Sequence, residues 1–288
     1  MLYFIVNKLS GKGKDTAKKI ITRLENLNLD YKMEFTRKKQ HAIELAREFS
    51  KKEDCTGIVA VGGDGTFSEV LNGIDTKIPM GFISSGSGND FLRTFAPKMT
   101  VEEQIDTVIK GQTKQIDYIQ INEKRSLNVA GTGFDVDILL MERKLRKFLR
   151  GSFCYYAALI ISIFTIKFRN FTIKIDDKIH VDEACLIMSI ANGKYFGGGM
   201  PISLDSSLDD GLMELVYIKK LPRYYIPKIL LKFMKGKLKE ETKYVEIHRC
   251  TSVECSVQPE MQMQTDGEIQ FMPSFKATLV KGGLTVFY

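Results

Sequence analysis

Two acidic residues lie inside short glycine-rich loops, where a carboxylate is unexpected beside a phosphate site. Asp64 is in GGDGT (62–66) and Asp90 is in SSGSGNDF (84–91); a third small-residue loop, NKLSGKGK, spans 7–14. Glycine lets the backbone approach a phosphate closely, and free N–H groups at a helix N-terminus favour anions. The acids would repel that phosphate, but a bridging Mg²⁺, which prefers carboxylate and phosphate oxygens, removes the conflict.

These loops match neither of the two common phosphate-binding fingerprints. None fits G-x-x-x-x-G-K-[ST], and no G-x-G-x-x-G follows a strand-like segment. A single loop of this kind is equally well explained as a tight turn between a strand and a helix. Three such loops, two of them carrying an acid, favour a phosphate site that lacks the usual lysine.

The loops follow strand-like segments in the first part of the chain. Apolar or alternating runs at 2–7, 31–35, 57–61, 79–83 and 115–121 predict strands, and apolar residues at helical spacing between them predict helices. This alternation predicts a three-layer α/β domain with a mainly parallel sheet. Ligands of such sheets bind beyond the carboxyl ends of the strands, which is where the three loops lie.

After Leu127 the pattern changes to a series of strand-like segments, which predicts an antiparallel β-sandwich. Two helical segments interrupt this series, at roughly 138–168 and 223–235, and the C-terminal strands are expected at 275–283 and 284–288. We therefore expect an α/β domain over 1–124 and a β-rich domain over 125–288. The cleft between them is the expected active site.

Composition is that of a globular protein with an excess of basic residues. Forty-two Lys and Arg against 35 Asp and Glu give 42 − 35 = +7, which either attracts polyanions or only maintains solubility. Five scattered cysteines without metal-ligand spacing predict reduced thiols and a cytoplasmic location. The N-terminus lacks the features of a signal peptide, and the uncharged run 151–166 is shorter than the ~20 residues that span a bilayer.

Several motifs, read in order, resemble one known family. VAVGGDGTFSEVLNGI closely resembles the nucleotide motif of the diacylglycerol kinase catalytic family, which includes bacterial lipid kinases and the sphingosine and ceramide kinases. NKLSGKG, PMGFISSGSGNDFLRT, ANGKYFGGGMPISLDSSLDDGLMELV and QTDGE resemble further motifs of that family. NAD kinases and some phosphofructokinases share GGDGT alone, but the ordered set from Asn7 to Glu268 is specific. Lys8 and Ser87 depart from the family's usual proline and threonine.

The resemblance implies a kinase that uses ATP and Mg²⁺ in phospholipid metabolism. Asp64 and Asp90 would organise the catalytic Mg²⁺, and Asp266 and Glu268 would act at the acceptor, with Glu268 as the candidate base. Without the resemblance, TDGE is better explained as a polar turn. The residues implied for ATP are Asn7, Ser10, Thr36, Gly62, Gly63, Asp64, Gly65, Thr66 and Ser87.

A second metal site is implied around Asp210. In some members of the family the equivalent acid binds a structural Mg²⁺, and the carbonyls of Ser207 and Leu212 would complete the site, with Asp117 joining through water. The alternative is that Asp210 is a simple turn residue.

The acceptor is expected to be a lipid at a membrane surface. One cationic set precedes the uncharged run 151–166, and another lies at 223–239. Cations among apolar residues suit the anionic headgroups of a membrane. The alternative is that they are the solvent-exposed charges of two amphipathic helices. Diacylglycerol is the first expected acceptor. A phosphotransferase resembling NAD kinase, with a soluble acceptor, and a non-catalytic lipid-binding protein are the alternatives. No nucleic-acid motif is present, and a homodimer is compatible with the sequence. The cationic residues are Arg143, Lys144, Arg146, Lys147 and Arg150, then Arg223, Lys228, Lys232, Lys235, Lys237 and Lys239.

Overall fold

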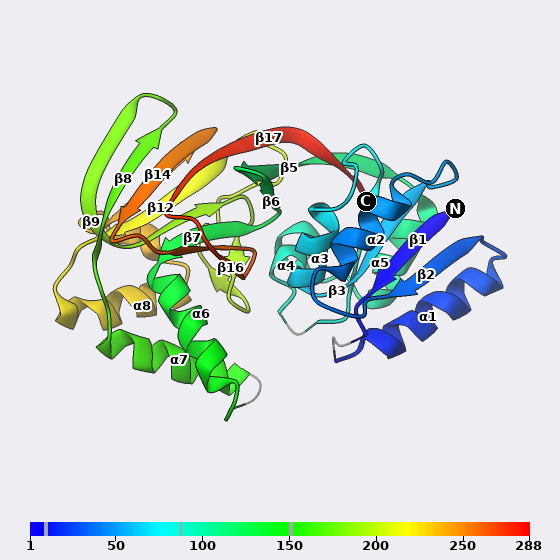
Figure 1. Cartoon of the computed structure of the whole chain (residues 1–288), viewed down its shortest axis with the longest axis horizontal. Coiled ribbons are helices and arrows are strands. Elements are labelled where there is room, and N and C mark those ends of the chain that lie inside the picture. Colours follow the sequence, from blue (N-terminus) through cyan, green and yellow to red (C-terminus); the bar gives the residue numbers. More distant parts are fainter. Residues whose placement is uncertain (9–10, 87, 150–151) are drawn as a thin grey trace.

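A computed structural model describes residues 1–8, 11–86, 88–149 and 152–288. The chain forms an α/β lobe, which holds both termini, and a β-rich lobe whose helices lie along one side (Figure 1). These are the two architectures that the sequence predicts.

The α/β lobe is built on four parallel strands in the order β4-β3-β1-β2. Helices cover both faces of this sheet, which makes the three expected layers. The strands are β1 (Leu2–Val6), β2 (Tyr31–Phe35), β3 (Gly57–Gly62) and β4 (Met80–Ser84), and the helices are α1 (Gly13–Asn26), α2 (His41–Phe49), α3 (Asp64–Leu71), α4 (Asp90–Phe95) and α5 (Val101–Lys110).

Alternate residues of the apolar strands pack into separate cores on the two faces. Phe4 and Val6 of β1 join the core that includes residues of α1 and α5. Tyr3 and Ile5 join the core that includes residues of α2 and α3. Because both faces are covered, the strands are apolar throughout, and the polar loops after them mark the sheet edge.

The β-rich lobe is antiparallel, with β9 pairing with both β7 and β8. Its strands are β6 (Lys124–Ser126), β7 (Val129–Gly133), β8 (Arg169–Ile175), β9 (Ile179–Ala191), β10 (Tyr195–Phe196), β11 (Met200–Pro201), β12 (Met213–Lys219), β13 (Val245–Cys250), β14 (Ser252–Gln258), β15 (Gln262–Thr265) and β16 (Glu268–Phe271).

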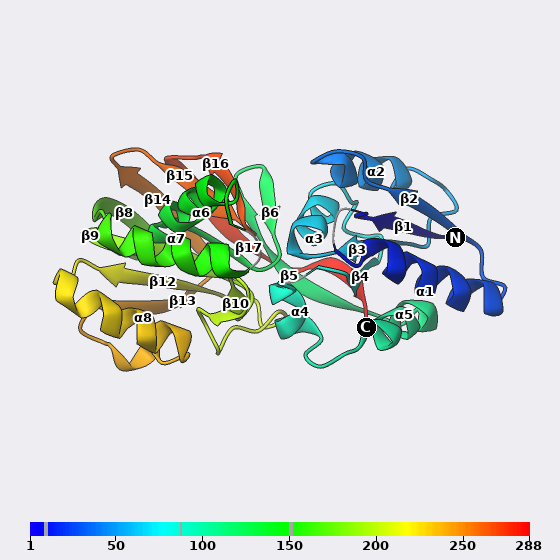
Figure 2. The same cartoon turned by 90° about the horizontal axis from the view of Figure 1, so that it is seen from below.

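Two long strands, β5 (Thr113–Ile121) and β17 (Ser274–Phe287), run between the lobes as an antiparallel pair (Figure 2). The early part of β17 pairs with β14, and Val286 near its end pairs with Met80 of β4. Two C-terminal strands were predicted here, and this was wrong. The structure has one strand with a register shift between Val280 and Leu284, so Gly282 and Gly283 mark an irregularity in the pairing, not a turn.

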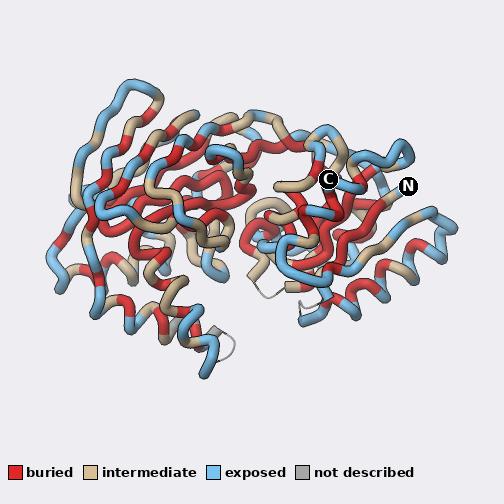
Figure 3. The backbone as a smooth tube through the Cα atoms, in the orientation of Figure 1, coloured by how far each residue is buried: buried red, intermediate tan, exposed pale blue. Residues whose placement is uncertain are grey.

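The helical segment predicted at 138–168 is two helices, α6 (Phe134–Leu145) and α7 (Ser152–Phe164). The second predicted segment contains α8 (Ile226–Met234). The central strands β7 and β12 are almost entirely buried, whereas these helices have faces exposed to solvent (Figure 3). Among the described helices, none is long and apolar enough to cross a membrane.

Candidate active site

The loops after β3 and β4 touch through their glycines. The N–H groups of Ser85 and Gly86 donate to the carbonyl of Gly62 at 2.7 and 3.2 Å. A Cβ atom on Gly86 would lie only 2.7 Å from the Cα of Gly63. Any larger residue at Gly86 would therefore separate the two loops.

The loop after β1 joins this pair. Asn7 donates from Nδ2 to Oγ1 of Thr66 at 3.1 Å, and its backbone N–H donates to the carbonyl of Val61 at 2.9 Å. Thr36, at the end of β2, is buried, and its N–H donates to the carbonyl of Val6 at 2.9 Å. The predicted residues from four strand ends therefore lie at one edge of the sheet. A Cβ on Gly65 would meet nothing within 4 Å, so this position opens onto free space.

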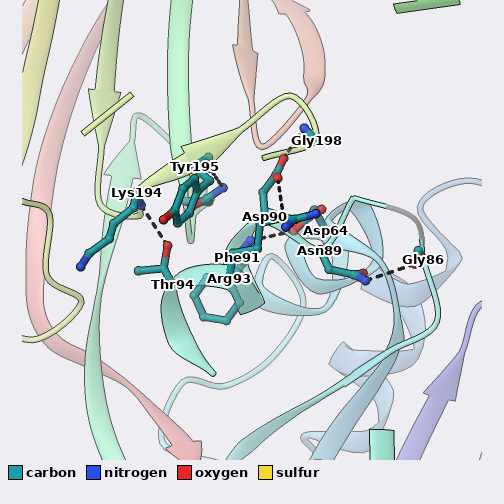
Figure 4. Close-up of polar contacts among 11 residues, drawn as sticks. Asp64, Gly86, Asn89, Asp90, Phe91, Arg93, Thr94, Lys194, Tyr195 and Gly198 are labelled. Carbon is teal, nitrogen blue, oxygen red and sulfur yellow. Dashed lines mark hydrogen bonds and ion pairs between the residues drawn. The ribbon is translucent and has the colours of Figure 1, made fainter. Parts of the chain in front are cut away.

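Asp64 and Asp90 are the first residues of α3 and α4 and lie near each other (Figure 4). Asp64 accepts a hydrogen bond on Oδ1 from the N–H of Phe91 at 2.9 Å, and Asp90 accepts one on Oδ2 from the N–H of Gly198 at 2.8 Å. Gly198 belongs to the β-rich lobe. Asp90 therefore connects the nucleotide loops to that lobe.

The two carboxylates suit a cation. Oδ1 of Asp90 is buried without a hydrogen bond from the described residues, and the guanidinium of Arg93 is 3.6 Å away. Burial raises the pKa of Asp90, and the negative charge of Asp64 raises it further. A divalent ion between the two would remove both penalties, so Asp64 and Asp90 are the residues that would hold Mg²⁺.

Asp266 belongs to a two-residue hairpin turn between β15 and β16, with φ of 48° at Asp266 and 84° at Gly267. Its carboxylate accepts hydrogen bonds from Oγ of Ser126 at 2.7 Å and from three successive backbone N–H groups, those of Leu127, Asn128 and Val129, at 3.0–3.2 Å. This side chain fixes the hairpin to the segment 126–129, which joins β6 to β7. Asp266 has this structural role although it also lines two neighbouring cavities.

Glu268, the next acid along the hairpin, points into a cleft of about 500 Å³ that GGDGT also lines. Its Oε1 lies 3.1 Å from Nζ of Lys39. Arg143 of α6 lines the same cleft. Neither cation was predicted as a nucleotide-site residue. Lys39 has no motif around it, and Arg143 was assigned to the membrane-docking set.

A second cavity of about 440 Å³ adjoins this cleft and shares Asp64, Gly88, Asp266 and Gly267 with it. Its other walls come largely from the segment 127–129 at the start of β7, from α6, from the first residues of α4 and from the loop at Gly197 and Gly198. Asp135 and the ion pair between Glu142 and Arg146, 2.8 Å long, also line it. Asp135 and Glu142 were not predicted as site residues, because in sequence they look like ordinary residues of an amphipathic helix.

The residues of the implied structural metal site lie in the loop before β12. Asp210 accepts the N–H of Leu212 at 3.0 Å on Oδ1, and its Oδ2 is paired with the guanidinium of Arg249. Ser207 donates to Asp209 at 2.7 Å. Asp117 accepts N–H groups of Gly211 and Gly282 on its two oxygens. In this structure Arg249 supplies the positive charge at Asp210, and no cluster of three or more metal-binding side chains exists among the described residues. The metal at Asp210 stays a prediction.

Three predicted residues, Ser10, Ser87 and Arg150, lie outside the described residues. The four described members of the first cationic set are all exposed; of these, Arg143 and Arg146 also line the two cavities, whereas Lys144 and Lys147 do not. In the second set, Lys228, Lys232, Lys237 and Lys239 are paired with acids. The free cationic surface is therefore smaller than the sequence suggested.

Comparison with protein families matches both parts of the chain. Residues 1–121 match the diacylglycerol kinase catalytic domain, and residues 128–288 match the YegS C-terminal NAD kinase beta sandwich-like domain. A diacylglycerol kinase of Staphylococcus saprophyticus is 29% identical over 273 residues, which cover 92% of this chain and 87% of that protein. A diacylglycerol kinase of Bacillus subtilis is 27% identical over 270 residues, covering 92% and 88%.

Solved structures share the fold. A diacylglycerol kinase from Bacillus anthracis has a TM-score of 0.80 at 23% identity, covering 100% of this chain and 96% of that chain. An NAD kinase from Archaeoglobus fulgidus, solved with ATP, has a TM-score of 0.56 at 16% identity, covering 100% and 94%. The predicted fold, an α/β domain followed by an antiparallel β-sandwich, is confirmed.

Proposed function

We infer from its site that this chain, which belongs to the diacylglycerol kinase catalytic-domain family with a YegS-type C-terminal sandwich, transfers the γ-phosphoryl group of ATP to a lipid hydroxyl. One observation carries the proposal. The cleft lined by GGDGT and the cavity on the β-rich side share Asp64, Gly88, Asp266 and Gly267, so a phosphate and an acceptor bound in them would meet there.

The chain's own groups divide the work. Backbone N–H groups of GGDGT, at the start of α3, would bind the phosphates, and Lys39 and Arg143 would neutralise part of their charge. Mg²⁺ held by Asp64 and Asp90 would stabilise the charge that develops during transfer. Glu268 would accept the proton of the attacking hydroxyl, since it lines the cleft beside the Asp266 turn. Asp266 holds the hairpin that positions Glu268.

Diacylglycerol is the acceptor we propose to test first, because two proteins similar to this chain are named diacylglycerol kinase. The product would be phosphatidic acid, which would place the reaction in phospholipid metabolism. A small apolar cavity of about 40 Å³, between the sandwich and the helices α6, α7 and α8, adjoins the cavity on the β-rich side, the acceptor cavity, and gives it an apolar wall. An acceptor with a soluble, charged head would leave this surface unused.

The same helices supply a surface for membrane contact on the cytoplasmic side. Phe148, Phe153 and Phe164 are 84%, 69% and 78% exposed, and Ile160 is 58% exposed. Large exposed apolar side chains beside Lys144 and Lys147 suit an anionic bilayer surface. A lipid hydroxyl at headgroup level would then enter the acceptor cavity without leaving the membrane.

A lipid panel tests the function. Purified protein would be given labelled ATP and Mg²⁺ with diacylglycerol, monoacylglycerol, ceramide and NAD, each with and without vesicles. We expect label in a lipid product. Label entering only NAD or another soluble acceptor would support an NAD kinase-like enzyme, and binding of lipid without any transfer would indicate a non-catalytic lipid-binding protein.

Vesicle sedimentation tests the membrane surface separately. Phe153→Ser and Phe164→Ser together should weaken sedimentation with anionic vesicles and raise the apparent KM for vesicle-borne lipid. Turnover of a short-chain, water-soluble diacylglycerol should stay unchanged. Tyr288→Ser is the matched control, because Tyr288 is also 62% exposed but belongs to the other lobe, which holds the C-terminus (Figure 1). Equal sedimentation of both variants would contradict this surface.

A further inference from the structure

Asp135, at the start of α6, is an unusual residue for the interior of a protein. It is 4% exposed, and its Oδ1 has no hydrogen-bond partner among the described residues. Its Oδ2 accepts a 3.4 Å hydrogen bond from Nε2 of Gln264. A buried polar atom without a partner destabilises the fold, so its presence suggests a partner that is not part of the chain.

The fold makes space for this carboxyl group. Gly131 of β7 lies under it, and a Cβ at Gly131 would be 2.7 Å from Oδ2 of Asp135 and 2.9 Å from Oγ of Ser189. The hydroxyl of Ser189 is itself buried without a partner among the described residues. A polar recess therefore lies between α6 and a sheet face that is otherwise packed with apolar side chains.

Asp135 lies where the two kinds of cavity meet. It lines the polar acceptor cavity and also the apolar cavity behind it, as Phe196 does. The apolar cavity continues past side chains such as Ile138, Leu159 and Ile229. The apolar cavity, at about 40 Å³, is too small for an acyl chain, so the linking atoms of a lipid would lie in the first cavity, of about 440 Å³, which Asp135 also lines.

One side chain connects Asp135 to the hairpin that carries the proposed base. Oε1 of Gln264 accepts the N–H of Gly267 at 2.9 Å, which turns its Nε2 towards Asp135. Gly267 directly precedes Glu268. The carboxyl group and the base are thus held in one rigid frame, as two contacts to a single substrate would require.

The charges around Asp135 favour its protonated form, in which Oδ1 can donate a hydrogen bond. On its own helix, Asp137 is paired with Arg169 of β8 and Glu142 with Arg146; across the cavity, the described walls contribute the acids Asp64, Asp90 and Asp266. No unpaired cation is among the described residues that line either cavity. Burial raises the pKa of Asp135 to about 7, so the neutral carboxyl group, with Oδ2 accepting from Gln264 and Oδ1 carrying the proton, is accessible near neutral pH.

We propose that Asp135 donates a hydrogen bond from Oδ1 to an ester carbonyl of the acceptor lipid, next to the hydroxyl that is phosphorylated. This inference rests on the proposed function. A diacylglycerol has ester carbonyls between its free hydroxyl and its chains, so the contact would fix the hydroxyl relative to Glu268. Asp135 would then select ester-linked acceptors over otherwise equal lipids without a carbonyl.

Paired substrates test the contact. Wild type, Asp135→Leu and Asp135→Asn would be compared on 1,2-diacylglycerol and on the 1,2-dialkylglycerol of equal chain length, whose ether links lack the carbonyl. We expect Asp135→Leu to lower kcat/KM for the ester roughly tenfold, the usual upper value for one neutral hydrogen bond. The ether should lose much less, so the ester preference should vanish. Asp135→Asn keeps a donor of the same shape and should retain the preference.

Three results would overturn the proposal. Equal loss on ester and ether in Asp135→Leu would make Asp135 a structural residue. No ester preference in the wild type would remove the carbonyl contact. A preference of the wild type for monoacylglycerol that disappears in Asp135→Asn would mean that the carboxyl group accepts from a second hydroxyl instead.

The pH dependence supplies a measurement that does not need Asp135→Leu to fold. In the wild type the ester preference should decline as pH rises through about 7, because the donor is lost, whereas Asp135→Asn should keep it. Identical pH behaviour of the two proteins would contradict the proposal. The proposed function fails separately from the Asp135 contact. It fails if the wild type phosphorylates neither lipid but does phosphorylate another acceptor.

Discussion

Replacing Asp135 by Asn should stabilise the protein, and more so at high pH. Burial raises the pKa of this carboxyl group to about 7 in the folded protein, whereas an unfolded chain has an Asp pKa of about 3.9. The folded state therefore holds the proton more tightly. Between these two values each rise in pH lowers the stability of the wild type, and above pH 7 the loss is complete. Asparagine keeps the shape of the neutral acid and has no charge to bury.

The size of the effect follows from the pH interval. From pH 5 to the folded pKa of about 7 there are two units, and about 1.36 kcal/mol per unit gives about 3 kcal/mol as an upper value. For one cooperative transition in a lobe of this size, that corresponds to roughly 6–12 °C in Tm. Asp135→Asn should therefore gain several degrees on the wild type between pH 5 and pH 8.

Calorimetric melting without Mg²⁺ measures this difference. Asp137→Asn is the matched control, because Asp137 is on the same helix but forms a bidentate ion pair with Arg169 at 2.8 and 3.0 Å. Breaking that pair should lower Tm at both pH values. If wild type and Asp135→Asn change in parallel between pH 5 and pH 8, the carboxyl group is not buried as an acid that titrates near 7.

Four further substitutions and one control test the catalytic assignments and the second metal site. Asp64→Asn should lower kcat about 10²–10³-fold with Tm unchanged or raised, and near-full activity at saturating Mg-ATP would refute its role. Glu268→Gln should lower kcat more than it changes the KM for ATP. Lys39→Met should mainly raise the KM for ATP. Lys38→Met is its control and should leave that KM unchanged, because it breaks only an exposed ion pair. Asp210→Ala should lower Tm, and a metal there requires the variant also to lose the part of the Mg²⁺ stabilisation that Asp64→Asn retains; an unchanged Mg²⁺ shift would leave Asp210 as a turn residue paired with Arg249.

The sequence predicted the sheet edge because its signals are local. A strand covered on both faces is apolar throughout, so its end is visible where glycine and polar residues begin, as at Gly62. The contact between Gly63 and Gly86 follows once β3 and β4 are neighbours. The sequence could therefore predict that Asp64 and Asp90 lie close together, because both follow the carboxyl ends of neighbouring parallel strands.

Other features of the site depend on contacts that no local pattern encodes. Asp-Gly at 266–267 predicts a hairpin turn, but the donors to Asp266 come from 126–129, about 140 residues earlier. Lys39 reaches the site only because β2 and α2 bring it opposite the hairpin of Glu268. The pair Gly282 and Gly283 looked like a chain turn, because only the partner strand β5 shows that β17 continues past the irregularity and pairs again from Leu284.

The cleft also explains how a phosphate site can do without a lysine in its glycine loop. Lysine in that loop would come from the same segment as the N–H groups and would neutralise phosphate regardless of what the rest of the chain does. Here the cations that line the cleft, Lys39 and Arg143, come from the loop after β2 and from α6 of the other lobe. Asp90 likewise holds Gly198 of that lobe. Full charge neutralisation of a bound triphosphate would therefore require both lobes in place. That arrangement would couple nucleotide binding to the geometry of the acceptor cavity, which α6 also lines.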